Sequence, residues 1–142
     1  MLDNISLHHI GVVVNKISND SANFQNFIEA SNISLPFDDV FQKVRVAFLD
    51  VYPIKIEFIE PLNIDSPISN FLNFGGGVHH IAFETDSLEK TKEKLCDKGA
   101  RPLQERPTIG FGGREIFFIY FPNSGIKIVE LIGSTPKNKD FS

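Results

Sequence analysis

The chain has 142 residues, of which 42% are hydrophobic and 23% are charged, and its formal net charge is −4. These values are typical of a globular protein with one domain that is long enough to bury a core. The acidic balance argues against the basic surface on which nucleic-acid binding depends, and no apolar run reaches the length that spans a bilayer.

The N-terminal residues 1–4 carry neither the basic start nor the apolar stretch of a signal peptide. Cys96 is the only cysteine, so the chain cannot form an internal disulfide. We therefore expect a cytoplasmic protein with no nucleic-acid partner and no membrane partner.

The first part of the chain predicts a strand, a helix and then further strands. Residues 7–14 are β-branched and apolar, which favours a strand. Ser18 can cap a helix that runs to about Glu29, and Pro36 ends that unit. The strands predicted next are 44–51 and 54–59, with a turn at Pro53.

The second part repeats this order after a segment rich in proline and glycine. A strand is predicted at 78–85, and Asp86 or Ser87 caps a helix that ends at about Lys98. Gly99 is suited to end this helix because glycine readily adopts the left-handed conformation found there. The strands predicted next are 101–105, 115–121 and 126–132.

The repeated order predicts an α+β fold. We expect two βαβββ modules in tandem that form a curved, cup-like mixed sheet with outer helices. Together they form a single domain of residues 5–133, followed by a polar, flexible tail at 134–142. The expected parts of the domain are module one at about 5–61, a linker at about 62–77 and module two at about 78–133.

One short pattern occurs at the start of both modules, as His-His-Ile-Gly at 8–11 and as His-His-Ile-Ala at 79–82. Each module also ends in an apolar strand that contains a glutamate. The glutamate follows the second histidine of the pattern by 48 residues in module one and by 50 in module two. This duplication predicts one four-ligand metal site shared by the two modules. The predicted metal ligands are His9, Glu57, His80 and Glu130.

The alternation of a strand selects the second histidine of each pattern, because successive residues point to opposite faces. His9 shares a face with Gly11, and His80 shares a face with the small Ala82, which leaves room for a ligand. The first histidine of each pattern is expected to pack or to support the ligands. The glutamate strands agree in register when Glu57-Phe58-Ile59 is aligned with Glu130-Leu131-Ile132.

Two imidazoles and two carboxylates predict one divalent metal ion, Zn, Ni, Co, Mn or Fe. Calcium prefers a shell made only of oxygen atoms. The alternative is a pair of structural histidines and two edge carboxylates. Against it, both glutamates interrupt strongly apolar strands, where an unpaired carboxylate is costly.

A glycine-rich loop at 110–114 is a further candidate site, because backbone N–H groups and an arginine can bind an anionic substrate. A plain hairpin explains the glycines equally well, and the spacing is not that of a phosphate-binding loop. The candidate substrate-binding residues are Gly110, Gly113 and Arg114.

These motifs resemble the vicinal oxygen chelate superfamily, which contains glyoxalase I, the methylmalonyl-CoA epimerases, extradiol dioxygenases and antibiotic-resistance proteins. The resemblance covers about residues 5–133 and is strongest to the methylmalonyl-CoA epimerases and glyoxalase I. The segments that carry it are His9-Ile10-Gly11-Val12, Glu57-Phe58-Ile59-Glu60-Pro61, Asp65-Ser66-Pro67-Ile68, 75–81 and Val129-Glu130-Leu131.

The resemblance implies the same four metal ligands and an enzyme that moves a proton next to a carbonyl group of a small-molecule substrate. It implies an acyl-CoA substrate for an epimerase, catalytic roles for Glu130 and Glu57, and a homodimer. The chain departs from the epimerases at Phe41, where they have a glutamate that serves as a base. Asp38 or Asp39 could replace that base if the loop shifts.

Three alternatives remain. A glyoxalase I-type lactoylglutathione lyase acts on a thiol conjugate and can use a metal-bound glutamate as its base, so it tolerates Phe41. An Fe(II) dioxygenase is disfavoured because Glu57 would occupy a position that dioxygen and substrate need. A non-enzymatic small-molecule-binding or resistance protein of the same fold is disfavoured by the complete set of four ligands.

Overall fold

The structure, a computed structural model, describes residues 4–29 and 32–134. The chain divides into two compact units, His9–His79 and Met1–His8 together with His80–Ser142. The boundary falls within the strands β1 (Ile5–Val13) and β5 (Gly77–Thr85). Except for Ser134, the predicted tail lies outside the described residues.

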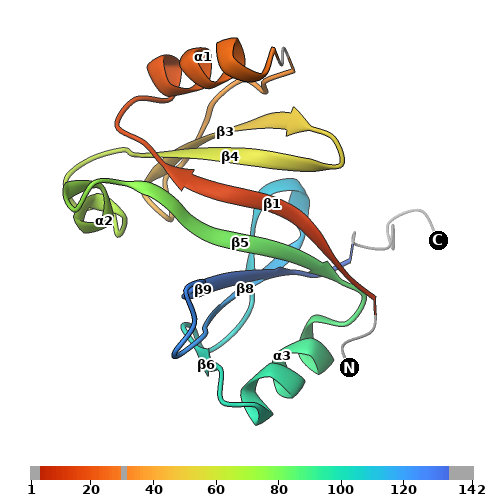
Figure 1. Ribbon diagram of the computed structural model, residues 1–142. Coiled ribbons are helices and arrows are strands. Elements are labelled where there is room, and N and C mark those ends of the chain that lie inside the picture. The colour runs from red at the N-terminus through yellow and green to blue at the C-terminus, as the bar shows by residue number, and fades with distance from the viewer. Residues whose placement is uncertain (1–3, 30–31, 135–142) are drawn as a thin grey trace. The chain divides into compact units, whose positions relative to one another are not determined.

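The unit His9–His79 contains a four-stranded sheet and a helix along it (Figure 1). The strands follow the order β2-β3-β4-β1, with β1 parallel to β4 and the other neighbours antiparallel. Besides β1, its elements are α1 (Ile17–Ile28), β2 (Phe37–Asp39), β3 (Val44–Val51), β4 (Ile54–Pro61) and α2 (Ser69–Asn73).

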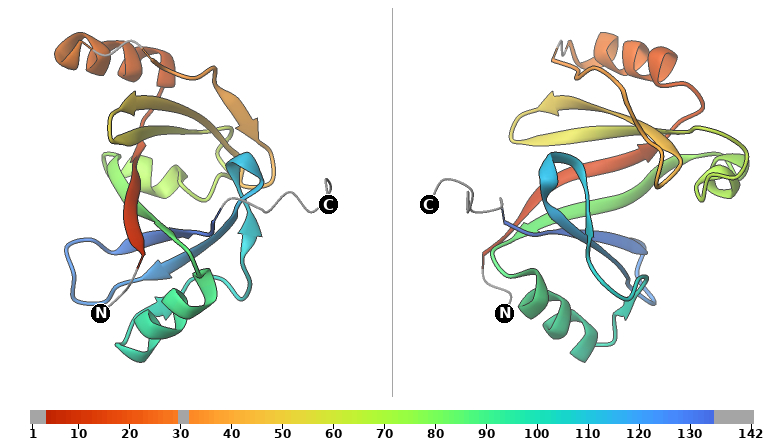
Figure 2. Two further views of the ribbon diagram at one scale, coloured as in Figure 1. Left: turned by 90° about the vertical axis from the view of Figure 1, so that its right-hand side faces the viewer. Right: turned by 180° about the vertical axis from the view of Figure 1, so that it is seen from behind.

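Alternate residues of β3 and β4 point to opposite sides of this sheet. Both sets of residues include buried apolar side chains, so each face carries a hydrophobic cluster. Helix α1 lies along β3 and β4 in each view (Figures 1 and 2). Ile17 at its start packs in one cluster with Leu49 and Phe58. A second cluster, on the face opposite α1, contains Phe48 and Ile59. The second face is the one toward which Glu57 points, since it is two residues from Ile59 on β4.

The other unit repeats this arrangement, with β5 parallel to β9 and β8 antiparallel to β9. Its strands follow the order β5-β9-β8-β6, and β7 also pairs with β8. Helix α3 packs against β8 and β9 (Figures 1 and 2) over buried Phe117 and Leu131. Besides β5, its elements are α3 (Leu88–Asp97), β6 (Arg101–Pro102), β7 (Thr108–Ile109), the 3₁₀ turn η1 (Phe111–Gly113), β8 (Glu115–Tyr120) and β9 (Ile128–Ile132).

The predicted α+β fold with two βαβββ modules is confirmed, and its main departure is the short strand β6. The sequence predicts a strand at 101–105, but the strand ends at Pro102, and the last backbone contact is the N–H of Leu103, which donates to the carbonyl oxygen of Phe118 at 3.0 Å. The reason is Gln104, whose Oε1 accepts a hydrogen bond from the N–H of Phe118 at 2.9 Å. Its side chain thereby takes the place of a backbone partner along that part of β8.

Helix capping confirms one prediction and contradicts another. Ser87 Oγ accepts a hydrogen bond from the N–H of Lys90, so it caps α3 as predicted. The predicted cap at Ser18 is wrong, because α1 already begins at Ile17. The acceptor at this helix start is Glu60 Oε1 on β4, 3.3 Å from the N–H of Ile17. Within residues 4–29 and 32–134, no helix is long and apolar enough to cross a membrane.

Candidate metal centre

The first histidine–glutamate pair is formed by β1 and β4, whose parallel register places Gly11 opposite Glu57. His9 precedes Gly11 by two residues on the same face of β1, and glycine leaves the space between them open. His9 Nε2 lies 3.5 Å from Glu57 Oε1. The side chains are 3% and 13% exposed, so this imidazole and this carboxylate meet almost out of contact with solvent.

The second pair has the same construction in β5 and β9. The parallel register places Ala82 opposite Glu130, and His80 precedes Ala82 by two residues. His80 Nε2 lies 3.1 Å from Glu130 Oε1, and the two side chains are 3% and 9% exposed. The register confirms the predicted alignment of the two glutamate strands, because each glutamate lies opposite the small residue of its module.

The first histidine of each pattern has different contacts. His8 Nε2 lies 4.0 Å from Glu84 Oε1, and both belong to the unit that contains His80. The ring of His79 contacts Phe71 edge to face, with 5.0 Å between the centroids. The two histidines of a pattern thus have separate surroundings, as the alternation of a strand requires.

Each pair also has a neighbouring phenylalanine that the sequence pattern does not single out. Phe48 lies opposite Glu57 on the antiparallel strand β3, and Phe118 lies opposite Glu130 on β8. The repeat of this phenylalanine is not visible in the sequence, because its distance from the glutamate differs between the modules. Phe48 is nine residues before Glu57, and Phe118 is twelve residues before Glu130. Only the strand pairing makes the two positions equivalent.

Chemically, each pair offers an imidazole nitrogen and a carboxylate oxygen within a small, buried space. Such nitrogen and oxygen donors suit borderline divalent ions such as Zn²⁺, Co²⁺ or Fe²⁺. Burial of a carboxylate is costly unless a positive charge compensates it. The donor set of each pair therefore fits a divalent ion.

The glycine-rich loop places the three remaining candidate residues near one another. The N–H of Gly110 donates to the carbonyl oxygen of Arg114 at 2.8 Å, and the N–H of Gly113 donates to that of Gly110 at 3.1 Å. Arg114 Nε donates to the carbonyl oxygen of Gly133, and Arg114 Nη2 to Glu84 Oε2, both at 2.9 Å. Arg114 thus links the end of β9 to β5, and substrate binding by this loop stays a prediction.

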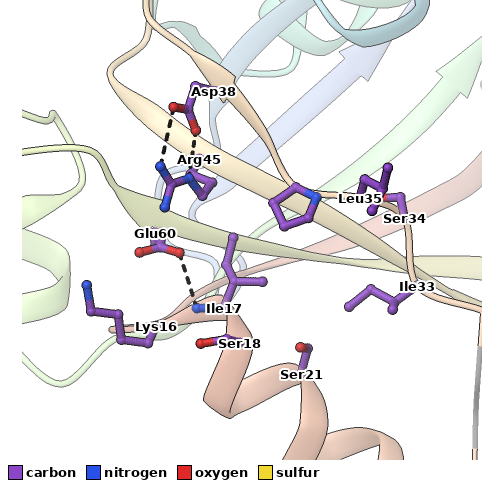
Figure 3. Close-up of a pocket in the computed structure, with 11 residues that line it drawn as sticks. Lys16, Ile17, Ser18, Ser21, Ile33, Ser34, Leu35, Asp38, Arg45 and Glu60 are labelled. Atoms are coloured by element: carbon purple, nitrogen blue, oxygen red, sulfur yellow. Dashed lines mark hydrogen bonds and ion pairs between the residues drawn. The ribbon is translucent and has the colours of Figure 1, made fainter.

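A groove of about 960 Å³ lies beside α1 on the face of β4 opposite Glu57 (Figure 3). Glu60, which is 7% exposed, lies in its wall. Asp38 pairs there with Arg45 through hydrogen bonds of 2.7 and 3.3 Å (Figure 3). The guanidinium of Arg45 lowers the pKa of Asp38, and the carboxylate of Asp38 in turn raises the pKa of Arg45. The Asp38 carboxylate therefore forms an ion pair with Arg45 on the α1 side of the sheet.

The chain is similar in sequence and fold to known proteins. A model of the Glyoxalase/Bleomycin resistance protein/Dioxygenase superfamily matches residues 8–118. The chain is 32% identical over 128 residues to an ethylmalonyl-CoA/methylmalonyl-CoA epimerase from Cereibacter sphaeroides. The matched residues cover 88% of this chain and 95% of the relative.

Solved structures agree with this match. Methylmalonyl-CoA epimerase from Mycobacterium tuberculosis is 25% identical, with a TM-score of 0.81 over 92% of this chain and 89% of that chain. A methylmalonyl-CoA epimerase from Streptomyces coelicolor, in complex with 2-nitronate-propionyl-CoA, is 26% identical, with a TM-score of 0.79 over 91% of this chain and 94% of that chain. The chain therefore belongs to the glyoxalase/bleomycin resistance protein/dioxygenase superfamily and resembles its methylmalonyl-CoA epimerases.

Proposed function

We propose that the protein holds one divalent metal ion and catalyses proton transfer at the carbon next to the carbonyl group of an acyl-CoA, as an epimerase does. The proposed ligands are His9 and Glu57 from one module and His80 and Glu130 from the other. The observation that carries the proposal is the repeated histidine–glutamate pair, with equal register in both modules. The similarity to epimerases over 88% of the chain supports the acyl-CoA substrate.

The charges of the four ligands suit this chemistry. Two carboxylates balance the charge of a divalent ion, and two neutral imidazoles complete the set without adding charge. When bound, such an ion stabilises the negative charge that develops on the carbonyl oxygen as the neighbouring carbon loses its proton. His9 and His80 are 2% and 3% exposed, and such burial lowers the local dielectric, which strengthens the attraction between an ion and a developing negative charge.

Glu57 and Glu130 are the proposed bases. An epimerase removes a proton from one face of a carbon and returns it to the other, which calls for two proton-transfer groups, and the two carboxylates supply that number. The other candidates are less suitable. Phe41 has no titratable group and is 87% exposed. Asp38 pairs with Arg45, and Asp39 Oδ1 accepts a hydrogen bond from the N–H of Gln42 at 2.9 Å.

A glyoxalase I-type lyase is the second candidate function. It is favoured by Phe41, which stands where the epimerases have a base glutamate. Isomerisation of a hemithioacetal needs proton transfer between adjacent carbons, for which a carboxylate at the metal suffices. Its substrate would be a thiol conjugate in place of an acyl-CoA. The homodimer that the resemblance implies remains a prediction, which sedimentation analysis tests.

The test is incorporation of solvent deuterium into methylmalonyl-CoA, run beside isomerisation of a glutathione hemithioacetal. We expect metal-dependent deuterium incorporation by the wild type, with a loss of at least 100-fold in Glu130→Ala and in Glu57→Ala. Glu105→Ala, which removes an exposed glutamate, is the control and retains the wild-type rate. Activity on the hemithioacetal alone would replace the epimerase with the lyase, and activity on neither substrate would contradict both.

A further inference from the structure

Phe48 neighbours both members of the first pair. Its position on β3 lies directly opposite Glu57, and its ring meets the ring of His9 edge to face. The ring centroids are 5.7 Å apart and the ring planes form an angle of 79°. Phe48 is 8% exposed and packs in the cluster with Ile59, so its own position is fixed by the core.

Phe118 has the same relationship to the second pair. It lies directly opposite Glu130 on β8, and its ring meets the ring of His80 edge to face, at 5.5 Å and 86°. It packs against the cluster of Ala82, Ile116 and Ile132. Each glutamate therefore has a small residue on one neighbouring strand and an aromatic ring on the other.

We propose that Phe48 and Phe118 are positioning residues of the metal centre, each of which holds one ligand histidine in its coordinating orientation. This inference rests on the proposed function, since it assigns both rings a role toward the ion. Neither phenylalanine has a donor atom, so the role is to orient a ligand and not to bind the ion.

The physical basis is the freedom of the imidazole ring about its bond to Cβ, a torsion that is broad for histidine. An aromatic ring packed edge to face against the imidazole favours one orientation, and such contacts are worth more than the buried area alone. Orientation matters because a ligand that is already aligned loses less freedom when the ion binds. Residues that orient metal ligands commonly affect metal affinity for this reason.

The experiment compares phenylalanines that lie on opposite faces of the same sheet in each module. Phe48→Leu and Phe118→Leu keep an apolar side chain but remove the ring that faces the histidine. Phe58→Leu and Phe117→Leu are the matched controls, because Phe58 and Phe117 are 3% and 0% exposed and lie in the clusters on the helix side of their sheets. Phe118→Tyr retains the ring and serves as the rescue variant.

The readouts are the dissociation constant for Co²⁺ and the visible absorption spectrum of the bound Co²⁺, which reports ligand geometry. We expect Phe48→Leu and Phe118→Leu to bind Co²⁺ about 2- to 12-fold more weakly, with a changed spectrum. Phe58→Leu, Phe117→Leu and Phe118→Tyr should keep the wild-type spectrum and affinity. Phe58→Leu and Phe117→Leu should lower the thermal midpoint at least as much as Phe48→Leu and Phe118→Leu do. A loss of Co²⁺ affinity in the second two variants alone then reports ring orientation and not general packing.

Equal Co²⁺ affinity and spectra in all five variants would overturn the inference while the proposed metal site stands. Equal losses in the test and control variants would overturn it as well, because general packing would then explain them. A wild-type protein that binds no Co²⁺ would instead refute the proposed function, and the positioning role with it. If Phe48→Leu does not fold, the half-buried Phe118 still decides the question through its leucine and tyrosine variants.

Discussion

Glu57 and Glu60 are three positions apart on β4 and therefore point to opposite faces of the same sheet. Glu57 meets His9 on one face, and Glu60 accepts a hydrogen bond from the first N–H of α1 on the other. Two carboxylates of one strand thus have separate tasks. Glu60 holds a helix start that has no side-chain cap of its own, and Glu57 belongs to the proposed metal centre.

Substitution of these two glutamates should affect two different properties, stability for Glu60 and metal affinity for Glu57. Glu60→Ala removes the acceptor at the start of α1 and should lower the free energy of unfolding by about 1–2 kcal/mol. It should leave the dissociation constant for Co²⁺ unchanged. Glu57→Ala should weaken Co²⁺ binding at least tenfold and should change the stability of the metal-free protein less. Urea unfolding and Co²⁺ titration of both variants measure these quantities.

The control for this pair is Glu105→Ala, which should match the wild type in both measurements because Glu105 is exposed. Weaker Co²⁺ binding by Glu60→Ala than by Glu57→Ala would contradict the assignment of the two faces.

The ion pair of Asp38 and Arg45 predicts a pH-dependent contribution to stability. Arg45 lowers the pKa of Asp38 below the ordinary value of 3.8, so the folded state binds fewer protons than the unfolded state between the two pKa values. The contribution is complete above about pH 4 and is lost as the pH falls through the lowered pKa. Both groups are exposed, so it is small.

Asp38→Asn tests this contribution. It should be slightly less stable than the wild type at pH 7, and the difference should shrink as the pH falls below about 4. Urea unfolding at pH 7 and pH 3 measures it. A difference that is the same at both pH values would show that the ionised carboxylate is not its source.

Arg114 should contribute to stability because it links the end of β9 to β5. Its side chain is 16% exposed, so Arg114→Ala leaves the Gly133 carbonyl without this donor and should lower the free energy of unfolding by about 1–2 kcal/mol. If the glycine-rich loop also binds substrate, as the sequence predicts, the KM for an acyl-CoA rises in this variant. Unchanged stability would contradict the structural role, and an unchanged KM would contradict substrate binding.

The buried pair Thr85 and Thr91 joins β5 to α3 through a hydrogen bond of 2.6 Å between their hydroxyl groups. Thr91→Val should cost about 1–2 kcal/mol, because it removes one partner from a buried hydroxyl. Combining it with Thr85→Val should cost less than the sum of the single variants, as expected for residues in contact. Additive losses in this double-mutant cycle would refute the coupling.

The two long helices, the long strands and the four candidate ligands could be predicted because they depend on local patterns, whereas the short β2 and β7 were not predicted. Alternation along a strand places His9 beside Gly11 and His80 beside Ala82, and the duplication makes each module a check on the other. The helix at 88–97 could be predicted from Ser87 because its hydroxyl caps a helix that starts at the next residue.

Features that depend on pairing between distant segments could not be predicted. Glu60 replaces the expected cap at Ser18 because the chain folds β4 against the start of α1, 43 residues away in sequence. Phe48 and Phe118 become equivalent only through the hairpins that pair β3 with β4 and β8 with β9. The side chain of Gln104 shortens β6 through a contact with Phe118, which strand propensity does not encode.

The most direct test of the central claim is the metal content of the purified protein after reconstitution with Co²⁺, for the wild type beside Glu130→Ala. The proposed metal centre predicts about one ion per chain in the wild type and a large loss in Glu130→Ala, with both proteins folded. No bound ion in the wild type, or the same content in both proteins, would contradict it.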